Sequence, residues 1–507
     1  MTKPHIELGG INIGTSQQKN SQRPNVQTSN NFHALILGDF SGAITPTEDL
    51  KVLQIDRDNF DEILEKINPK LNLDLGKGHS LDLAFKELED FEPDALYENL
   101  EVFAQLRSLR RRLSSQTLYA DAVEEMKQWQ NQTAPTEATE IQSITEELSA
   151  QELLNATLTE TTSREPTTGL SIDDNLAKIL IRDIIAPHIL PKKDPKQTEY
   201  ITSVDNAISE TMNNILHHPQ FQALEGSWRG LYSLIKRTIT DNHLKFFIVD
   251  FDKEHLHNDV NIDDLSQSLV YKKLVEPYTF TTNAKSWSVW FGDYTISDNV
   301  NDVVFLERMG TLAEQANITF ISTASSQVVS CESLALTPDS DDWQATRNED
   351  VKKAWSYLHD STQSKHLALT FPRILARLPY GKKTRSASSF DYEEMPETNH
   401  DNYLWSNAGY ALLTMLAESF SLNKWEFLPG EVNEIDNLPV HVYEDEGDKE
   451  TKPCAEILLT EKGAEIIKNH GIIPVWSIKQ QDKVRIGPMI SLHSAPQLIL
   501  GHWLIKS

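Results

Sequence analysis

Two stretches of the sequence, HALILGDFSG at 33–42 and SVWFGDYTIS at 288–297, share one pattern although about 250 residues separate them. In each, an apolar run typical of a buried strand leads into Gly, Asp, an aromatic residue and a hydroxyl residue. The motif residues are Gly38, Asp39, Phe40, Gly292, Asp293 and Tyr294. The repetition raises a choice between a duplicated catalytic loop and a duplicated piece of architecture.

The enzymatic interpretation of these motifs depends on their carboxylates. Enzymes of the α/β class place catalytic or Mg²⁺-binding Asp residues at the carboxyl ends of buried strands, where Asp39 and Asp293 are expected. A phosphate-binding loop, however, needs several close glycines or a Gly-Lys-Ser/Thr, and neither motif has them. Gly38 and Gly292 more simply allow a strand to end in a tight turn. We therefore interpret both motifs as structural. A soluble metal-dependent enzyme using Asp39 and Asp293 stays the less favoured alternative.

Composition excludes several classes of protein. The chain has 507 residues, 39% of them hydrophobic, enough for more than one sizeable core. Its net charge of −28 opposes binding to nucleic acid and to anionic membranes. Cys331 and Cys454 are too few for a disulfide framework and lack metal-site spacing. No stretch has the length of a membrane span, and residues 1–24 lack the apolar region of a signal peptide. We expect a cytoplasmic protein without membrane insertion.

The organisation of the chain follows from shifts in composition. Residues 1–30 are polar and are expected to form a flexible arm, and 31–115 read as a small α/β unit. Residues 116–170 form an acidic linker; within it, 131–165 contain seven Glu, one Arg and no aromatic residue, with one amphipathic helix expected at 144–158. Residues 171–507 read as a larger α/β domain.

Hydrophobic periodicity predicts the secondary structure. Helices are expected at 96–113, 176–190, 201–218, 221–238, 303–316 and 407–422. Strands are expected at 33–40, 81–91, 243–251, 287–294, 317–325, 366–381 and 455–460, and 52–67 reads as a short strand passing into a helix capped by Asp56 or Asp58. Alternating helices and near-continuous apolar strands predict an α/β fold with a mainly parallel or mixed sheet flanked by helices.

The predicted helix 221–238 has an apolar face and one charged pair. Leu224, Trp228 and Leu231 share the face, so we place Trp228 in the core. Glu225 and Arg229 are four residues apart, and we interpret them as a largely exposed ion pair that locks one helix to its neighbours rather than as a catalytic acid and a substrate clamp. On this interpretation, truncating Trp228 is far more damaging than truncating Glu225.

The remaining candidates for chemistry are histidines. His217-His218 and His255-Leu-His257 lack the further ligands, at defined spacing, that a zinc site requires. The sequence also lacks a Gly-x-Ser-x-Gly elbow and a His-Glu-x-x-His motif. We therefore predict no catalytic residue, no metal and no cofactor, and the chain reads as an assembly component.

The stretch FQALEGSWRGLYSLI at 221–235, which contains Glu225, Trp228, Arg229 and Gly230, resembles the signature region of the large subunit of the bacterial type VI secretion contractile sheath. The resemblance continues, in order, through five further blocks. These are FGDYTIS (291–297), the Thr-Phe-Pro-Arg run with Pro372 and Arg373 in 367–381, NYLWSNAGYAL with Trp405 (402–412), LPVHVY (438–443) and LTEKGAEIIKNHGIIPV (459–475).

The first half of the chain resembles the small sheath subunit. The resemblance rests on HALILGDFSG (33–42), QIDRDNFDEIL (54–64) and the run from 84 to 113. In the usual system the two subunits are separate chains that intertwine. The resemblance therefore implies a fusion whose two parts interlock, and in which the Gly-Asp-aromatic motifs are equivalent strand ends. It also implies that the large subunit's C-terminal region is missing here.

The resemblance implies a non-enzymatic structural component of a type VI secretion apparatus, which joins, starts, caps or modifies the contractile sheath. A full self-polymerising sheath protomer is the alternative. The implied partners are sheath subunits, baseplate or tube components and the chain itself, contacted through residues 1–30 or exposed sheet edges.

Overall fold

A computed structural model describes residues 6–8, 11–13, 30–42, 50–76, 80–133, 185, 197–279, 286–445, 447–495 and 497–503. The chain divides into two compact units. The first comprises Met1–Pro93 and Asn214–Ser507, and the second comprises Asp94–Asn213. The predicted helix at 144–158 and most of the one at 176–190 lie outside the described residues.

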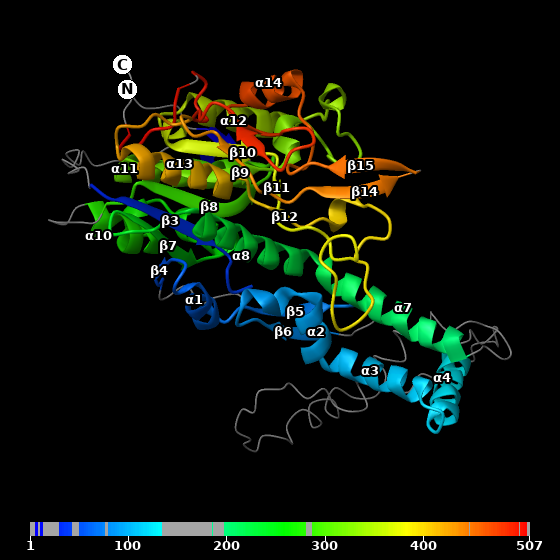
Figure 1. The fold of residues 1–507 in the computed structure, drawn as a ribbon. Helices are drawn as coiled ribbons and strands as arrows, with labels where there is room; N and C mark the ends of the chain where they lie inside the picture. Colours follow the sequence, from blue (N-terminus) through cyan, green and yellow to red (C-terminus); the bar gives the residue numbers. More distant parts are fainter. Residues whose placement is uncertain are drawn as a thin grey trace, which may run out of the picture. The chain divides into compact units, whose positions relative to one another are not determined.

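A nine-stranded sheet forms the centre of the first unit, in the order β13-β17-β16-β10-β9-β8-β3-β7-β4 (Figure 1). Its strands are β3 (Phe32–Gly38), β4 (Leu53–Ile55), β7 (Leu244–Asp250), β8 (Val289–Ile296), β9 (Thr319–Ala324), β10 (Leu367–Phe371), β13 (Glu434–Ile435), β16 (Ile473–Ser477) and β17 (Val484–Ile486). The six strands from β16 to β7 are parallel, and β4, β17 and β13 add antiparallel edges. The predicted α/β fold with a mixed sheet is therefore confirmed.

Strand β3 joins the two parts of the chain. It pairs in parallel with β7 from Phe32↔Leu244 to Gly38↔Asp250, and with β8 from Ala34↔Val289 to Leu37↔Gly292. All of its residues are buried, as expected of an apolar strand covered on both faces of a parallel sheet. The interlocking of the N-terminal part with the rest of the chain is confirmed at this strand.

Helices cover both faces of the sheet. On one face Leu35 and Leu37 share a core cluster with residues of α9 (Lys253–Val260), α11 (Val300–Ala316) and α12 (Glu349–Asp360). On the other face α13 (Gly409–Asn423) lies against β8, β9 and β10, and α8 (Pro219–Arg237) packs beside α13. Because successive side chains of β3 point to opposite faces of the sheet, the strand contributes side chains to the core on both faces.

The remaining elements of the first unit are short. Its strands form antiparallel pairs: β1 (Ile6–Leu8) with β2 (Ile11–Ile13), β5 (Lys70–Asp74) with β6 (Ser80–Ala84), β11 (Ile374–Leu375) with β12 (Trp405–Ser406), and β14 (His441–Asp445) with β15 (Asp448–Lys452). The helices are α1 (Phe60–Ile67), α10 (Glu276–Thr279) and α14 (Glu461–Asn469).

The second unit contains α2 (Pro93–Asn99, which begins at the unit boundary), α3 (Glu101–Ser114), α4 (Tyr119–Thr133) and most of α7 (Gln197–Leu216). The prediction of one helix over 96–113 is wrong, because Leu100 is extended and separates α2 from α3. The apolar stripe is nevertheless buried at Phe103, Leu106 and Leu109. A bidentate contact between Arg110 and Asp205 connects α3 to α7.

Two further predictions are wrong. Residues 455–460 form no strand, since Ala455 makes only an isolated bridge to Ile374. Helix α1 is not capped by Asp56 or Asp58, because Asn59 occupies that position without a side-chain cap. Asp56 instead accepts a hydrogen bond from the backbone N–H of Asp58. The predicted strand 81–91 is a strand only over Ser80–Ala84, and Leu88–Phe91 form a 3-10 helix. The predicted strand 366–381 is divided into β10 and β11 and ends at Leu375. The other predicted elements within the described residues exist, with shifted ends.

Candidate functional site

The two Gly-Asp-aromatic motifs lie side by side in the sheet. Leu37 pairs with Gly292, so Gly38 comes to stand beside Asp293, and a Cβ built on Gly38 would lie 3.2 Å from the Asp293 Cβ. The prediction of equivalent strand ends is correct for Gly38, which ends β3, and wrong for Gly292, which lies within β8.

A register shift between Phe291 and Thr295 makes the second motif a bulge inside β8. The Ser322 hydroxyl lies within hydrogen-bonding distance of the Gly292 and Tyr294 carbonyl oxygens, at 2.9 and 2.7 Å. A Cβ on Gly292 would lie 2.6 Å from the Phe320 ring, so this bulge requires glycine. The same motif therefore adopts two backbone conformations: the end of a strand in β3 and a bulge within β8.

The carboxylates beside β3 hold the backbone. Asp250 accepts the N–H groups of Phe40 and Ser41 at 2.8 and 3.0 Å, and Asp39 accepts that of Gly42 at 2.8 Å. Asp293 accepts a 2.8 Å hydrogen bond from the Tyr410 hydroxyl of α13. Each of these carboxylates therefore has a structural partner. Among the described residues no group of three or more His, Cys, Asp or Glu has the arrangement of a metal site.

Electrostatics sets Asp39 apart from an ordinary surface carboxylate. The protein packed around this exposed side chain, together with the charges of Asp250, Asp252 and Asp293, raises the pKa of Asp39 from 3.8 to about 6. Burial likewise raises the pKa of Asp293. Like charges gathered at one end of a sheet oppose ionisation. The ionisation of Asp39 therefore works against the fold at neutral pH.

Trp228 connects α8 to the turn that follows β3. Its side chain is fully buried, and its indole N–H donates a 3.0 Å hydrogen bond to the Phe40 carbonyl oxygen. The ring packs edge-on against Phe40 and Phe60, with centroids 5.4 and 5.7 Å apart. The prediction that Trp228 belongs to the core is confirmed.

Two glycines of the same helix allow α8 to approach the β12–α13 segment. A Cβ on Gly226 would lie 2.9 Å from the Trp405 carbonyl oxygen, and one on Gly230 would lie 2.3 Å from the Ser406 hydroxyl oxygen. Both contacts are too short for any side chain. The signature Leu-Glu-Gly-Ser-Trp-Arg-Gly-Leu thus combines one large anchor with two positions of close approach.

The Glu225 carboxylate is buried, which corrects the prediction of an exposed pair. It accepts hydrogen bonds from Arg229 at 2.6 Å and from Arg377 at 2.8 Å. Arg377 also donates to Glu394 at 2.8 and 3.2 Å and stands over the Tyr380 ring at 4.4 Å. Four charges are therefore buried as two acids and two bases. Periodicity missed this because the Glu225 partner Arg377 lies 152 residues away.

Within this network, the environment of Glu394 favours its ionised form. Burial raises the pKa of Glu394, but the adjacent Arg377 guanidinium lowers it further, and the net pKa falls from 4.5 to about 2. A depressed carboxyl pKa stabilises the fold above the unfolded value of about 4.5, and this stabilisation is lost as the pH falls towards 2. Glu225 and Glu394 thus hold α8 to the 376–395 segment at neutral pH.

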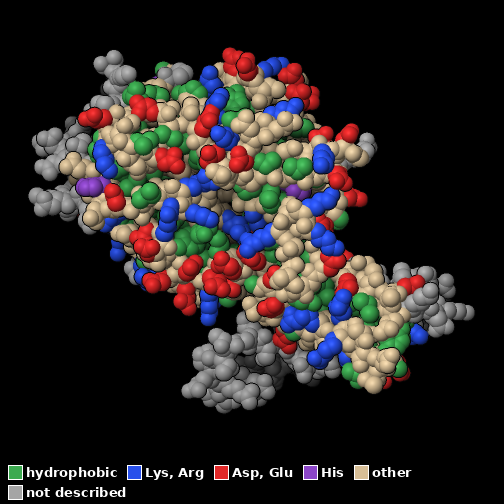
Figure 2. Space-filling view, in the orientation of Figure 1, with side chains coloured by type: hydrophobic (Ala, Val, Ile, Leu, Met, Phe, Trp, Pro, Cys, Tyr) green, Lys and Arg blue, Asp and Glu red, His purple; other side chains and the backbone are tan. Residues whose placement is uncertain are grey.

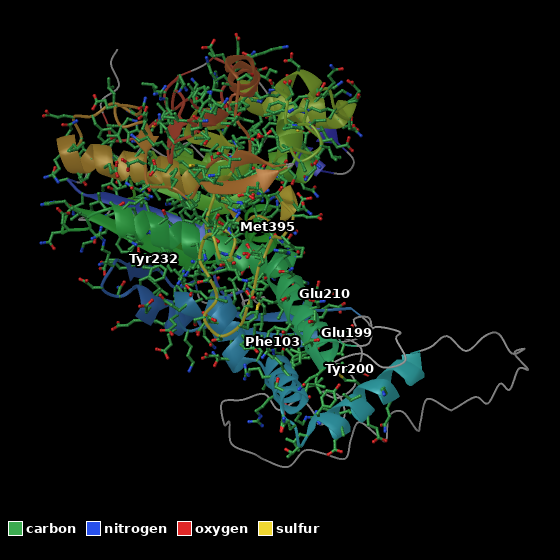
Figure 3. The ribbon with its side chains drawn as sticks, turned by 45° about the vertical axis from the view of Figure 1, so that its right-hand side comes forward. Phe103, Glu199, Tyr200, Glu210, Tyr232 and Met395 are labelled. Carbon is green, nitrogen blue, oxygen red and sulfur yellow. The ribbon has the colours of Figure 1, made fainter. Side chains whose placement is uncertain are left out.

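The residues around Pro372 form a second anchored corner. Glu456 accepts hydrogen bonds from the Arg373 backbone at 2.9 Å and from its guanidinium at 2.7 Å. Burial raises the pKa of Glu456, yet the contact with Arg373 brings it down to about 2. Trp405 donates its indole N–H to the His400 carbonyl oxygen at 3.1 Å and belongs to a small core cluster with Met395, which Figure 3 labels. Besides the Arg373–Glu456 ion pair, the Glu456 N–H donates to the Arg373 carbonyl oxygen at 3.1 Å, and the Leu375 N–H donates to the Cys454 carbonyl oxygen at 2.7 Å.

Two family models match the chain. The first is VipB, described as EvpB/VC_A0108, tail sheath N-terminal domain, over residues 198–493. The second is the type VI secretion system family described as VipA, VC_A0107 or Hcp2, over residues 12–149.

Two curated relatives, both from Pseudomonas aeruginosa, agree with these matches. The chain is 32% identical to type VI secretion system sheath protein TssC1 over 300 residues. The aligned region covers 56% of this chain and 58% of the relative. It is 34% identical to type VI secretion system sheath protein TssB1 over 79 residues, and this aligned region covers 14% of the chain and 46% of the relative. Less than two thirds of either relative is therefore spanned. None of the helices formed by described residues has the length and apolarity needed to cross a membrane.

We expect Glu225→Ala and Trp228→Ala to destabilise the fold to a similar extent. Removing Glu225 leaves Arg377 and Arg229 short of a partner inside the protein, which costs about 3–5 kcal/mol. Removing the Trp228 ring also costs about 3–5 kcal/mol. Glu349, exposed on α12 and paired with Lys352, is the matched control, and its truncation should cost only a few tenths of a kcal/mol. Urea unfolding measures all three; a Glu225→Ala cost as small as that of Glu349→Ala would contradict the network.

Asp39→Asn is expected to stabilise the protein at neutral pH. A carboxyl whose pKa is raised on folding binds its proton more tightly in the folded state, so its ionisation penalises the fold above about pH 6 and not below about pH 4. The melting temperature of the variant should exceed that of the wild type at pH 7.5, and the gain should disappear at pH 4. Exposed Glu397→Gln serves as the control. A gain that is equal at both pH values would refute this explanation.

Proposed function

Since the chain belongs to the type VI secretion tail-sheath family, we propose that it is a structural component of the contractile sheath that carries small-subunit and large-subunit parts on one chain. The observation that carries the proposal is the position of β3. This strand comes from the part matched by the small-subunit family, and it pairs on both sides with strands β7 and β8 of the part matched by the large-subunit family.

The fusion has a simple physical rationale. A central parallel strand has two neighbours and both faces covered, so a sheet lacking β3 would expose two strand edges and two apolar surfaces. When the strand and its sheet are on separate chains, the sheet depends on an encounter between them. Covalent connection makes the pairing intramolecular, and its effective concentration no longer depends on a second gene product.

The proposal assigns no catalytic role to the strand-end carboxylates. Asp39 and Asp250 accept backbone N–H groups of the turn after β3, and Asp293 accepts the Tyr410 hydroxyl. These contacts favour a structural use of the residues that the enzymatic alternative would need. A cytoplasmic location and contacts with baseplate or tube components stay parts of the proposal, as does the domain division at 31–115, 116–170 and 171–507.

Electron microscopy of mixtures tests the function. We expect the purified chain to co-sediment with sheaths assembled from separate small and large sheath subunits, and to be visible on them when gold-labelled. Trp228→Ala, which removes the anchor of α8 beside β3, provides the matched variant and should fail to co-sediment. Sheaths that form normally while the wild-type chain stays in the supernatant would contradict the proposal.

The same experiment separates the two roles within the sheath. Long hollow tubes formed by the purified chain alone would favour a self-polymerising protomer. Small assemblies that join sheaths only in mixtures would favour a component that joins, starts, caps or modifies the sheath.

A further inference from the structure

A basic hollow lies beside α8 in the first unit. Its volume is about 510 Å³, and it is walled by the second half of α8, by β11, by the start of α13, by Ile435 and by residues 437–439. Figure 2 shows Lys and Arg side chains gathered around a hollow in the visible face. The cations that line it are Arg229, Lys236 and Arg237, and no Asp or Glu is among the lining residues. Because Arg229 is already paired with Glu225 at 2.6 Å, Lys236 and Arg237 supply the positive charge of the hollow. In a chain with 75 acidic and 47 basic residues, this wall is an exception.

The hollow has groups suited to a carboxylate. Lys236 is exposed on α8, its ammonium lies 5.6 Å from the centre of the Tyr232 ring, and it forms no ion pair with a carboxylate of the described residues. Tyr232, labelled in Figure 3, is itself 38% exposed. The Ser406 hydroxyl is buried, and within the described part of the chain it has no hydrogen-bond partner. An anionic group with apolar neighbours therefore fits the hollow better than a neutral one.

An acidic hairpin elsewhere in the same unit offers the complementary surface. Strands β14 and β15 pair only with each other, and Figure 1 draws them reaching beyond the strands of the large sheet. Within 444–450 the sequence EDEGDKE has five acidic residues and one lysine. Val442 at its base is 52% exposed. A two-stranded hairpin is marginally stable in water on its own, so a partner that covers it would also order it.

We propose that the acidic hairpin 441–452 of one copy docks into the basic hollow of a second copy. The inference rests on the proposed sheath function in taking another copy as the partner. Charge complementarity selects the occupant, because Arg229, Lys236 and Arg237 line the hollow without any Asp or Glu, whereas the hairpin has five acidic residues and one lysine within 444–450. The contact joins two different surfaces, so it is heterologous and leaves one free hairpin and one free hollow at the ends of every chain of copies. Such contacts build rings or helical arrays.

The Lys383–Glu444 contact within one copy does not compete strongly with docking. The two charges are 3.1 Å apart, but both side chains are largely exposed. An exposed pair of this kind contributes about 0–1 kcal/mol. Glu444 can therefore exchange its partner, and the other carboxylates of the hairpin remain available.

Site-directed cross-linking tests the contact. Ser233→Cys places a thiol in the wall of the hollow, and Lys449→Cys places one on the hairpin; the native Cys331 and Cys454 are buried. Two differently tagged copies, each with one change, are mixed and oxidised mildly. We expect a disulfide-linked pair that contains both tags, at a yield about tenfold above that of either variant alone, because the contact joins unlike surfaces.

Charge reversal provides the specificity control. Lys236→Glu in the copy that carries Ser233→Cys should lower the yield about tenfold, and Glu450→Lys in the other copy should restore it. Lys273→Glu, on an exposed lysine that does not line the hollow, should change nothing. Raising the salt concentration to about 0.5 M should lower the wild-type yield by screening.

Two results would overturn the inference: equal yields for like and unlike pairs, or a yield unaffected by Lys236→Glu. Both can be told apart from failure of the proposed function. Co-sedimentation with sheaths in the absence of the cross-link would refute the docking contact alone. A specific cross-link without co-sedimentation would refute the sheath function alone.

Discussion

The pairing of β3 with both β7 and β8 is the constraint on which the first unit depends. The strand is contributed from a point more than 200 residues before its neighbours, and it brings Leu35, Ile36 and Leu37 to a fully buried position. Burying each of these side chains is worth about 1.5–3 kcal/mol. Strand β3 therefore connects strands on both of its sides in the middle of the sheet. The order of the parts along the chain is therefore secondary to the position of this one strand.

The turn after β3 connects this strand to the helices of the first unit through hydrogen bonds. The backbone of Phe40 makes two hydrogen bonds: its N–H donates to the Asp250 carboxylate, and its carbonyl oxygen accepts from the Trp228 indole N–H. Trp228 belongs to α8, whose two glycines bring it against Trp405 and Ser406. Helix α8 thus contacts the turn after β3 on one side and the β12–α13 segment on the other.

Buried charge in this protein serves specificity more clearly than stability. Arg377 lies between Glu225 and Glu394 with little access to water, and the desolvation of such groups offsets most of their attraction. Apolar residues of similar volume would hold α8 as firmly but in several registers. The bidentate geometry of Arg377 allows one arrangement of α8 relative to the 376–395 segment.

The sequence predicted those features whose cause is local. Trp228 was placed in the core because apolar residues recur at helical spacing around it, and β3 because its apolar run has no polar interruption. The burial of Glu225 was missed because its partners are distant in sequence and periodicity counts only apolar side chains. The break at Leu100 was missed because the apolar stripe continues in phase on both sides of it. The bulge at Gly292 depends on the ring of Phe320 from a neighbouring strand, which no local pattern contains. A single charged residue flanked by apolar ones, Arg377 within ILARLPYG, is the signal in the sequence that could have indicated a buried charge.

Native-state hydrogen exchange measures the central claim most directly, because it reports the opening free energy of each strand separately. If β3 is a permanent member of the sheet, the amides of Leu35, Ile36 and Leu37 exchange only through global unfolding. Their opening free energies then equal those of Ile248 in β7 and Phe291 in β8. Opening free energies for β3 that fall more than about 2 kcal/mol below those of its neighbours would contradict the account, since β3 would then detach from a sheet that survives without it.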